Sequence, residues 1–209
     1  MPNWCFSHVT LNGSKDSMDK LEKAFQEAFA SSPIPTDFED TWLGNLLLKL
    51  GYDEDAIQHG DIRCRGSVTD WSRTDDKTIE LDVESAWGPH IYCIQLFVQN
   101  IDPEIEMVYT AEEPGNGLYW TNDPAVVGTV YIDRFDNGDP EFPEGLSACL
   151  ETIYDAPQEN VRQALAKYLG HDGDFDTLTK EISEMVEERD PDSYVYFHIY
   201  QEVPMEDCD

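Results

Sequence analysis

The chain has 209 residues, of which 44 are Asp or Glu and 13 are Lys or Arg, so its formal net charge is −31. This balance argues against direct binding to nucleic acid, because the phosphates would be repelled. With 40% hydrophobic and 11% aromatic residues, the composition excludes a disordered acidic tail. The sequence therefore predicts a folded protein, either one large domain or one domain with an extension.

The sequence also predicts a cytoplasmic protein without disulfides. It opens Met1-Pro2-Asn3-Trp4, with no basic and apolar leader, and no apolar run approaches the roughly 18 residues of a membrane span. The cysteines are odd in number and form no CxxC pair, which indicates neither a zinc site nor a disulfide framework. We expect Cys208 to be an exposed thiol and most of the other cysteines to be reduced thiols in the core. These are Cys5, Cys64, Cys93 and Cys149.

The first elements follow from hydrophobic periodicity. Residues 5–12 alternate as a strand does, and Ser14 or Ser17 is suited to cap a helix that runs to Phe29. A second helix is expected over 38–50. For the next part of the chain, the sequence predicts two strands, a helix that begins at Trp87-Gly88-Pro89, a third strand, an Asn-Gly turn and a return strand. The strands cover 62–72, 78–85, 105–112 and 118–121.

This order of strand, helix, two strands, helix and strand, with one inserted helix, is typical of the split βαβ or ferredoxin-like arrangement. We therefore predict an α+β fold with an antiparallel ferredoxin-like core over 1–135. A helical, acidic extension with a final strand, residues 136–209, is expected to dock on that core. A strand at 126–133 precedes this extension, whose elements are helices at 144–154, 157–169 and 176–188 and a strand at 194–203.

Three short segments resemble the YubB-type ferredoxin-like family of plasmids and phages. They are Met1-Pro2-Asn3-Trp4-Cys5 running into the first strand, Ala86-Trp87-Gly88-Pro89, and Glu113-Pro114-Gly115-Asn116-Gly117-Leu118-Tyr119. The resemblance covers roughly residues 1–135. It implies a fold and a mobile-element context, but no enzymatic activity that could be transferred to particular residues.

Carboxylates line one predicted face of the sheet. If Ile79, Leu81 and Val83 face the helices, the acidic residues between them lie on the open face, and the fourth strand adds more. The candidate partner-binding residues are Glu80, Asp82, Glu84, Glu104, Glu106 and Glu112. Like charges clustered across a sheet are unfavourable, which favours a role outside the molecule. In the alternative interpretation, Arg63 and Arg65 on the neighbouring strand neutralise these carboxylates as ordinary surface pairs.

No catalytic, cofactor-binding or metal-binding residue is predicted. The five histidines lack ligand spacing, and no Gly-x-Ser-x-Gly motif is present. Asp172, Asp174 and Asp176 are spaced like the start of a calcium loop, but Thr177 and Ser183 stand where that loop needs Gly and Glu. We expect instead that Asp176 caps a helix.

The charge distribution suggests a basic partner. Between Thr78 and Val161 the chain carries 17 carboxylates and one basic residue, Arg134. Duplex DNA has one charge per about 1.7 Å, so a net charge of −31 matches roughly 50 Å of duplex, close to the roughly 43 Å diameter of a globule of this length. The sequence thus predicts a nucleic-acid mimic that inhibits a host defence nuclease, a CRISPR effector or a restriction enzyme. The alternative is a non-catalytic binding or regulatory module of a plasmid or phage whose acidity serves solubility.

Overall fold

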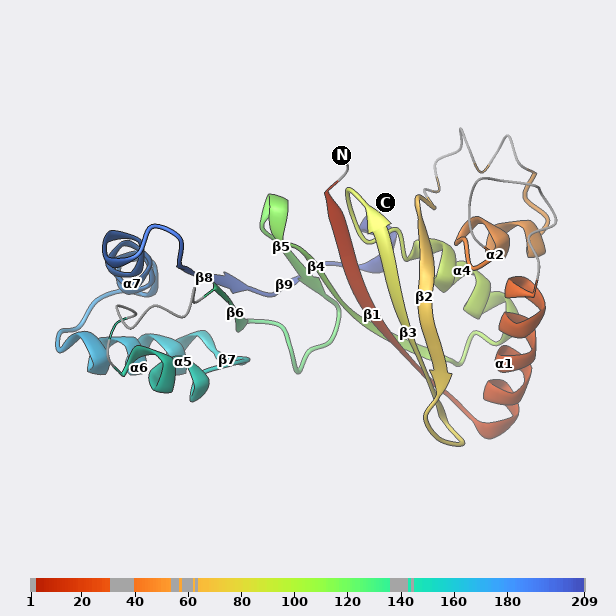
Figure 1. Ribbon diagram of the computed structural model, residues 1–209. Helices are drawn as coiled ribbons and strands as arrows, with labels where there is room; N and C mark the ends of the chain where they lie inside the picture. The colour runs from red at the N-terminus through yellow and green to blue at the C-terminus, as the bar shows by residue number, and fades with distance from the viewer. Residues whose placement is uncertain are drawn as a thin grey trace. The chain divides into compact units, whose positions relative to one another are not determined.

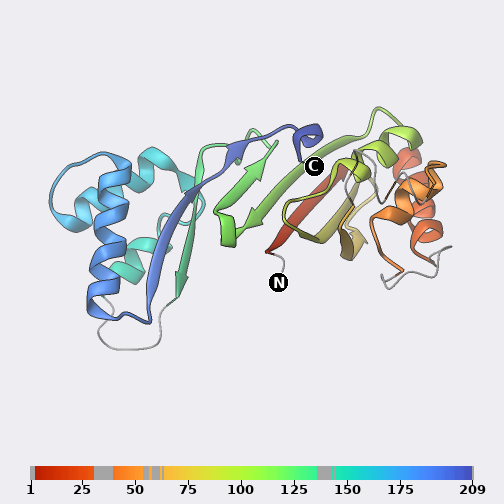
Figure 2. The ribbon, with the colours of Figure 1, turned by 90° about the horizontal axis from the view of Figure 1, so that it is seen from above.

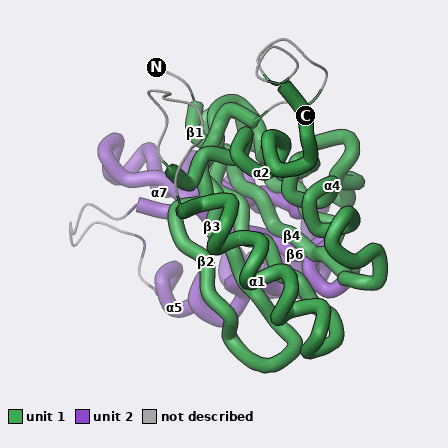
Figure 3. The backbone as a smooth tube through the Cα atoms, turned by 90° about the vertical axis from the view of Figure 1, so that its right-hand side faces the viewer, with its two compact units in different colours: residues 1–124, 202–209 green, residues 125–201 purple. Residues whose placement is uncertain are grey.

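The computed structural model describes residues 3–30, 40–53, 57, 62, 64–135, 143 and 145–208. The chain forms two compact units, drawn in different colours in Figure 3: unit 1, Met1–Pro124 with Glu202–Asp209, and unit 2, Ala125–Gln201. The division thus falls at 124/125 rather than at the expected 135/136. The reason is that strand β6 (Thr129–Phe135) pairs with strands of unit 2.

The main sheet has six strands in the order β2-β3-β1-β4-β5-β9. In this sheet β1 pairs antiparallel with both β3 and β4, and β2 pairs antiparallel with β3. The second and third strands therefore pair, and the third and fourth flank the first, as the sequence predicted. The strands are β1 (Trp4–Asn12), β2 (Gly66–Arg73), β3 (Thr78–Ala86), β4 (Glu106–Glu113), β5 (Leu118–Thr121) and β9 (Gln201–Glu202).

The longer helices of unit 1 cover one face of this sheet (Figure 1). They are α1 (Lys15–Phe29), α2 (Gly44–Lys49) and α4 (Tyr92–Ile101), and single 3-10 turns lie at η1 (Pro114–Asn116) and η2 (Met205–Asp207). Alternate residues of β1 and β3 point into the core beneath the helices, where Val9, Leu11 and Leu81 are at most 1% exposed. The residues between them point away from the helices, as expected for period-two strands.

Two helices of unit 1 begin later than the sequence predicted. In the described residues, the helix expected over 38–50 is limited to α2. It begins late because Trp42 forms a β-bridge with Ser67 and Leu43 N–H donates to the Gly66 carbonyl at 3.0 Å. The helix expected to begin at Trp87 begins at Tyr92. Trp87 and His90 have φ values of 74° and 46°, which lie outside the right-handed helical region.

In its described residues, unit 2 contains a three-stranded sheet, in the order β7-β6-β8, and three helices. Its helices lie on one side of β6 and β8 (Figure 2). The packed face consists of apolar side chains, including Val130, Ile132 and Val195, against the helices. The new elements are β7 (Ala156–Pro157), β8 (Tyr194–Ile199), α5 (Leu146–Glu151), α6 (Gln158–Leu169) and α7 (Phe175–Arg189).

Three details of the C-terminal part differ from expectation. The strand expected over 194–203 is divided, because β8 pairs with β6 while β9 belongs to the six-stranded sheet. The first helix is shorter than 144–154, and β7 was not predicted. In the part of the chain described, every helix is too short or too polar to cross a membrane.

Candidate functional site

The strongest candidate site is the face of the main sheet that α1, α2 and α4 leave uncovered. On β3, Glu80, Asp82 and Glu84 alternate with the buried residues Ile79 and Leu81, so the three carboxylates share this uncovered face. Asp82 is exposed, whereas Glu80 and Glu84 are partly buried. The strand thus presents a carboxylate at every second residue, about 6.7 Å apart.

A fourth carboxylate, not singled out from the sequence, joins this row. Asp70 on β2 is the direct cross-strand partner of Asp82 on β3. The register of β2 shifts between Val68 and Asp70, at a bulge that brings Asp70 opposite the acidic strand. The side chains Asp70, Glu80, Asp82 and Glu84 are called the acidic row below.

The remaining predicted residues lie apart from the acidic row. Glu106 and Glu112 belong to β4, which is separated from β3 by β1. Glu104 is not on the strand at all: it lies in the turn before β4, where its N–H donates to Asp102 Oδ1 at 3.0 Å. Glu104 is therefore not on the fourth strand, where the sequence predicted it, whereas Glu106 and Glu112 are.

The strand between the two acidic strands presents aromatic and polar side chains. Phe6 stands between Glu84 and Glu112, and His8 stands next to Asp82. Phe6 is 55% exposed, which leaves its ring available to a partner. His8 Nδ1 lies 2.8 Å from Asp82 Oδ1 in an exposed pair. The alternation of β1 in the sequence could have indicated both residues, since each is opposite in phase to the buried ones.

In the described part of the chain, Lys and Arg side chains do not neutralise the acidic row. Among the described residues, no Lys or Arg lies within 4.0 Å of Asp70, Glu80 or Glu84, and His8 pairs with Asp82. Arg65 precedes β2 and is exposed, and Arg63 lies outside the described residues. The alternative of neutralisation by Arg65 is therefore not observed.

Arg73, at the end of β2, pairs with two carboxylates of unit 1. Its Nη1 donates to Asp19 Oδ1 at 2.6 Å and to Glu22 Oε2 at 2.9 Å, both on α1. This hydrogen bond lowers the pKa of the Asp19 carboxyl. Lys15 likewise pairs with Asp76 at 2.8 Å. Arg73 and Lys15 thus pair with carboxylates of α1 and of the turn between β2 and β3.

The aspartates that resemble a calcium loop have other roles. Asp174, rather than Asp176, caps α7, because Asp174 Oδ1 accepts the Thr177 N–H at 2.8 Å. Asp172 Oδ1 accepts a hydrogen bond from Arg162 Nη1 at 2.6 Å. In the described part of the chain, no group of three or more His, Cys, Asp or Glu side chains is placed to hold a metal ion.

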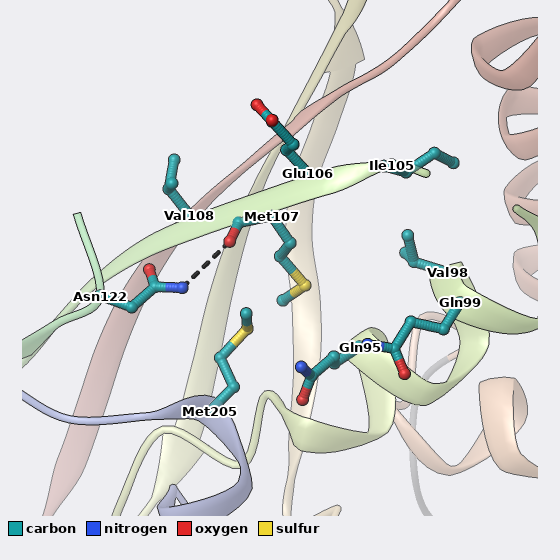
Figure 4. Close-up of a pocket in the computed structure, with 9 residues that line it drawn as sticks. All are labelled: Gln95, Val98, Gln99, Ile105, Glu106, Met107, Val108, Asn122 and Met205. Carbon is teal, nitrogen blue, oxygen red and sulfur yellow. Dashed lines mark hydrogen bonds between the residues drawn. The ribbon is translucent and has the colours of Figure 1, made fainter. Parts of the chain in front are cut away.

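Unit 1 also contains a pocket of about 410 Å³ between α4 and β4. In Figure 4 the Met107 side chain points from β4 toward α4, which carries Gln95 and Gln99, and Met205 lies beside Met107. The Asn122 side chain hydrogen-bonds the backbone of β4 at Met107 O. Among the described lining residues Glu106 is ionisable, and the others offer a ligand amides and apolar surface. Its lining residues are Gln95, Val98, Gln99, Ile105, Glu106, Met107, Val108, Asn122 and Met205.

Comparison with known proteins adds no assignment to these surfaces. No family model, no curated protein and no solved structure matches the chain.

Proposed function

We propose that this chain is a stoichiometric inhibitor that occupies the nucleic-acid-binding groove of a basic host defence nuclease, either a CRISPR effector or a restriction enzyme. The observation that supports this most is the acidic row, Asp70, Glu80, Asp82 and Glu84, on a sheet face without lysine or arginine partners among the described residues. Unpaired like charges side by side cost stability in the isolated protein. A basic partner removes that cost, which favours a surface used in binding.

The spacing of the charges suits a phosphate-binding groove. Carboxylates at alternate residues of β3 are about 6.7 Å apart, whereas one DNA strand carries a charge about every 3.4 Å along the axis. β3 alone therefore has about half the linear charge density of a DNA strand, and Asp70 on β2 raises it. The net charge of −31 adds long-range attraction to a basic protein.

We further infer that the four strands β2-β3-β1-β4, with α1 and α4, belong to the ferredoxin-like class. The pairing and direction of these strands are those that a split βαβ repeat requires. Residues 1–135 resemble the YubB-type family of plasmids and phages, a context in which a defence nuclease is a natural target. This function requires the cytoplasm, where such nucleases meet foreign DNA.

The test is a nuclease cleavage assay with a charge-reversed acidic row. Glu80→Lys combined with Glu84→Lys places two cations opposite the basic residues of the target, so inhibition should fall by at least tenfold. Each substitution should change the free energy of unfolding by no more than about 0.5 kcal/mol, because no Lys or Arg among the described residues pairs with Glu80 or Glu84.

The control is Glu184→Lys with Glu188→Lys on α7, which has the same separation in sequence and the same change of charge, and which also removes the exposed pair between Glu184 and Lys180. This control should inhibit nearly as well as the parent. If both double variants lose inhibition equally, inhibition depends on the net charge of the chain and not on the acidic row. If both fold and inhibit like the parent, the acidity serves solubility, and the chain is better described as a non-catalytic binding or regulatory module.

A further inference from the structure

A second surface, in unit 2, is rich in aromatic side chains. The register of β6 and β8 pairs Asp133 with Tyr196 and Phe135 with Tyr194. The residues between them, such as Ile132 and Val195, pack against the helices. The aromatic residues therefore lie on the sheet face that the helices of unit 2 leave uncovered.

Three of these rings form a stack. The centroids of Phe135 and Tyr194 are 6.0 Å apart, and those of Tyr194 and Tyr196 are 5.3 Å apart, with interplanar angles of 26° and 16°. Tyr194 thus stacks with both of the other rings. Phe135 and Tyr196 are the more exposed residues, at 50% and 43%.

Carboxylates accompany the stack. Glu187 Oε1 accepts a hydrogen bond from the Tyr196 hydroxyl at 3.0 Å. Asp133 is the cross-strand partner of Tyr196, and it interacts with the Tyr194 hydroxyl, whose pKa is raised by burial and by the Asp133 charge. The nearest cation in sequence, Arg134, is 3.8 Å from Glu151 and belongs to the opposite side of β6. Exposed ring faces next to carboxylates are therefore available to a cation from outside.

We propose that this aromatic face binds arginine side chains of a basic protein segment. Guanidinium groups stack on the exposed rings of Phe135 and Tyr196, and the neighbouring carboxylates of Asp133 and Glu187 attract them. Charge complementarity selects this occupant, because unit 2 has 17 carboxylates against five Lys and Arg residues. Nucleobases also stack on aromatic rings, but their phosphates would be repelled by this unit.

This inference does not depend on the proposed inhibition of a nuclease. It concerns other residues, on another sheet, and its test uses peptides rather than an enzyme. A failure of the acidic row to inhibit would leave the arginine preference of unit 2 unaffected, and the reverse also holds.

The experiment is a titration of the full chain with two peptides of equal length and charge, one rich in arginine and one rich in lysine, at about 150 mM salt. We expect tighter binding of the arginine peptide. Phe135→Leu with Tyr196→Leu removes both exposed rings and should weaken binding of the arginine peptide roughly tenfold, so that the preference for arginine over lysine disappears. Tyr196→Phe keeps the ring and should keep the preference.

The matched control is Tyr52→Leu, which removes a ring of similar exposure, 39%, from unit 1 and should leave both affinities unchanged. Equal affinity of the parent chain for the two peptides would overturn the proposal, as would a single-stranded oligonucleotide that binds this face. If the double variant loses the fold of unit 2, NMR of the parent chain tests the proposal instead. The arginine peptide should then shift the ring resonances of Phe135 and Tyr196, and unchanged resonances would overturn the proposal.

Discussion

At the scale of single residues, burial rather than sequence position sets the chemistry of the cysteines. All five are free thiols, and Cys208, expected to be exposed near the C-terminus, is 1% exposed. Its Sγ lies 3.0 Å from the hydroxyl of Tyr109, whose pKa is raised by burial. Burial also raises the pKa of Cys5 to about 12. The position of Cys208 could not be predicted from its polar neighbours, because its burial depends on contacts 99 residues away in the chain.

This burial predicts an order of thiol reactivity. At pH 8 a thiol reagent should modify Cys149 first, because it is the one cysteine that is not fully buried. Cys5 should react only when the protein unfolds, since almost none of a thiol with a pKa of about 12 is thiolate at pH 8. Mass spectrometry of partly labelled protein, with and without denaturant, measures the order. Rapid labelling of Cys208 in the native protein would contradict the structure.

At the scale of elements, sequence periodicity identified the buried side of β3, whereas the place of other residues on the sheet depends on local geometry and strand pairing. The alternation in β3 placed Glu80, Asp82 and Glu84 on one face correctly. It could not place Asp70, because the bulge in β2 changes the register without changing the pattern. It also could not show that β1 brings Phe6 and His8 between the two acidic strands, since strand order depends on tertiary pairing.

The start of α4 and the cap of α7 show the same limit. Pro89 is suited to a first helical position, yet the left-handed conformation of Trp87 and His90 delays the helix to Tyr92. Asp174 and Asp176 are both suited to cap a helix, and in the structure Asp174 is the N-cap of α7. Helix existence was therefore predictable in these regions, whereas the first residue was not.

The connection between α6 and α7 yields a prediction about pH. His171 Nε2 lies 3.0 Å from Glu181 Oε2, and this contact raises the pKa of His171. A histidine whose pKa is higher in the folded state stabilises the fold below its unfolded value of about 6.5, and that contribution disappears as the pH rises through the folded pKa. His171→Gln should therefore be less stable than the parent at pH 5.5 and about equally stable well above the folded pKa.

Chemical denaturation of the parent and the variant at pH 5.5, 7 and 8.5 measures this difference. Glu181→Gln removes the other partner and should show the same trend. A stability difference that stays constant over this range would contradict a role for the ion pair.

At the scale of the whole molecule, acidity is shared by both units and is not confined to a tail. Unit 1 has 27 carboxylates against eight Lys and Arg residues, and unit 2 has 17 against five. Each unit has its own hydrophobic core. A folded chain with two cores and this net charge favours a partner of opposite charge, and the acidic row of unit 1 and the aromatic face of unit 2 offer it two different chemistries.

The central claim, that the chain takes the place of nucleic acid on a basic protein, is tested most directly by competition. A defence nuclease is saturated with labelled duplex DNA at a fixed salt concentration, and the chain is added while the anisotropy of the DNA is followed. The account predicts displacement of the DNA, with an apparent inhibition constant that rises in proportion to the DNA concentration. A ternary complex, in which the nuclease holds both the DNA and this chain, would contradict it.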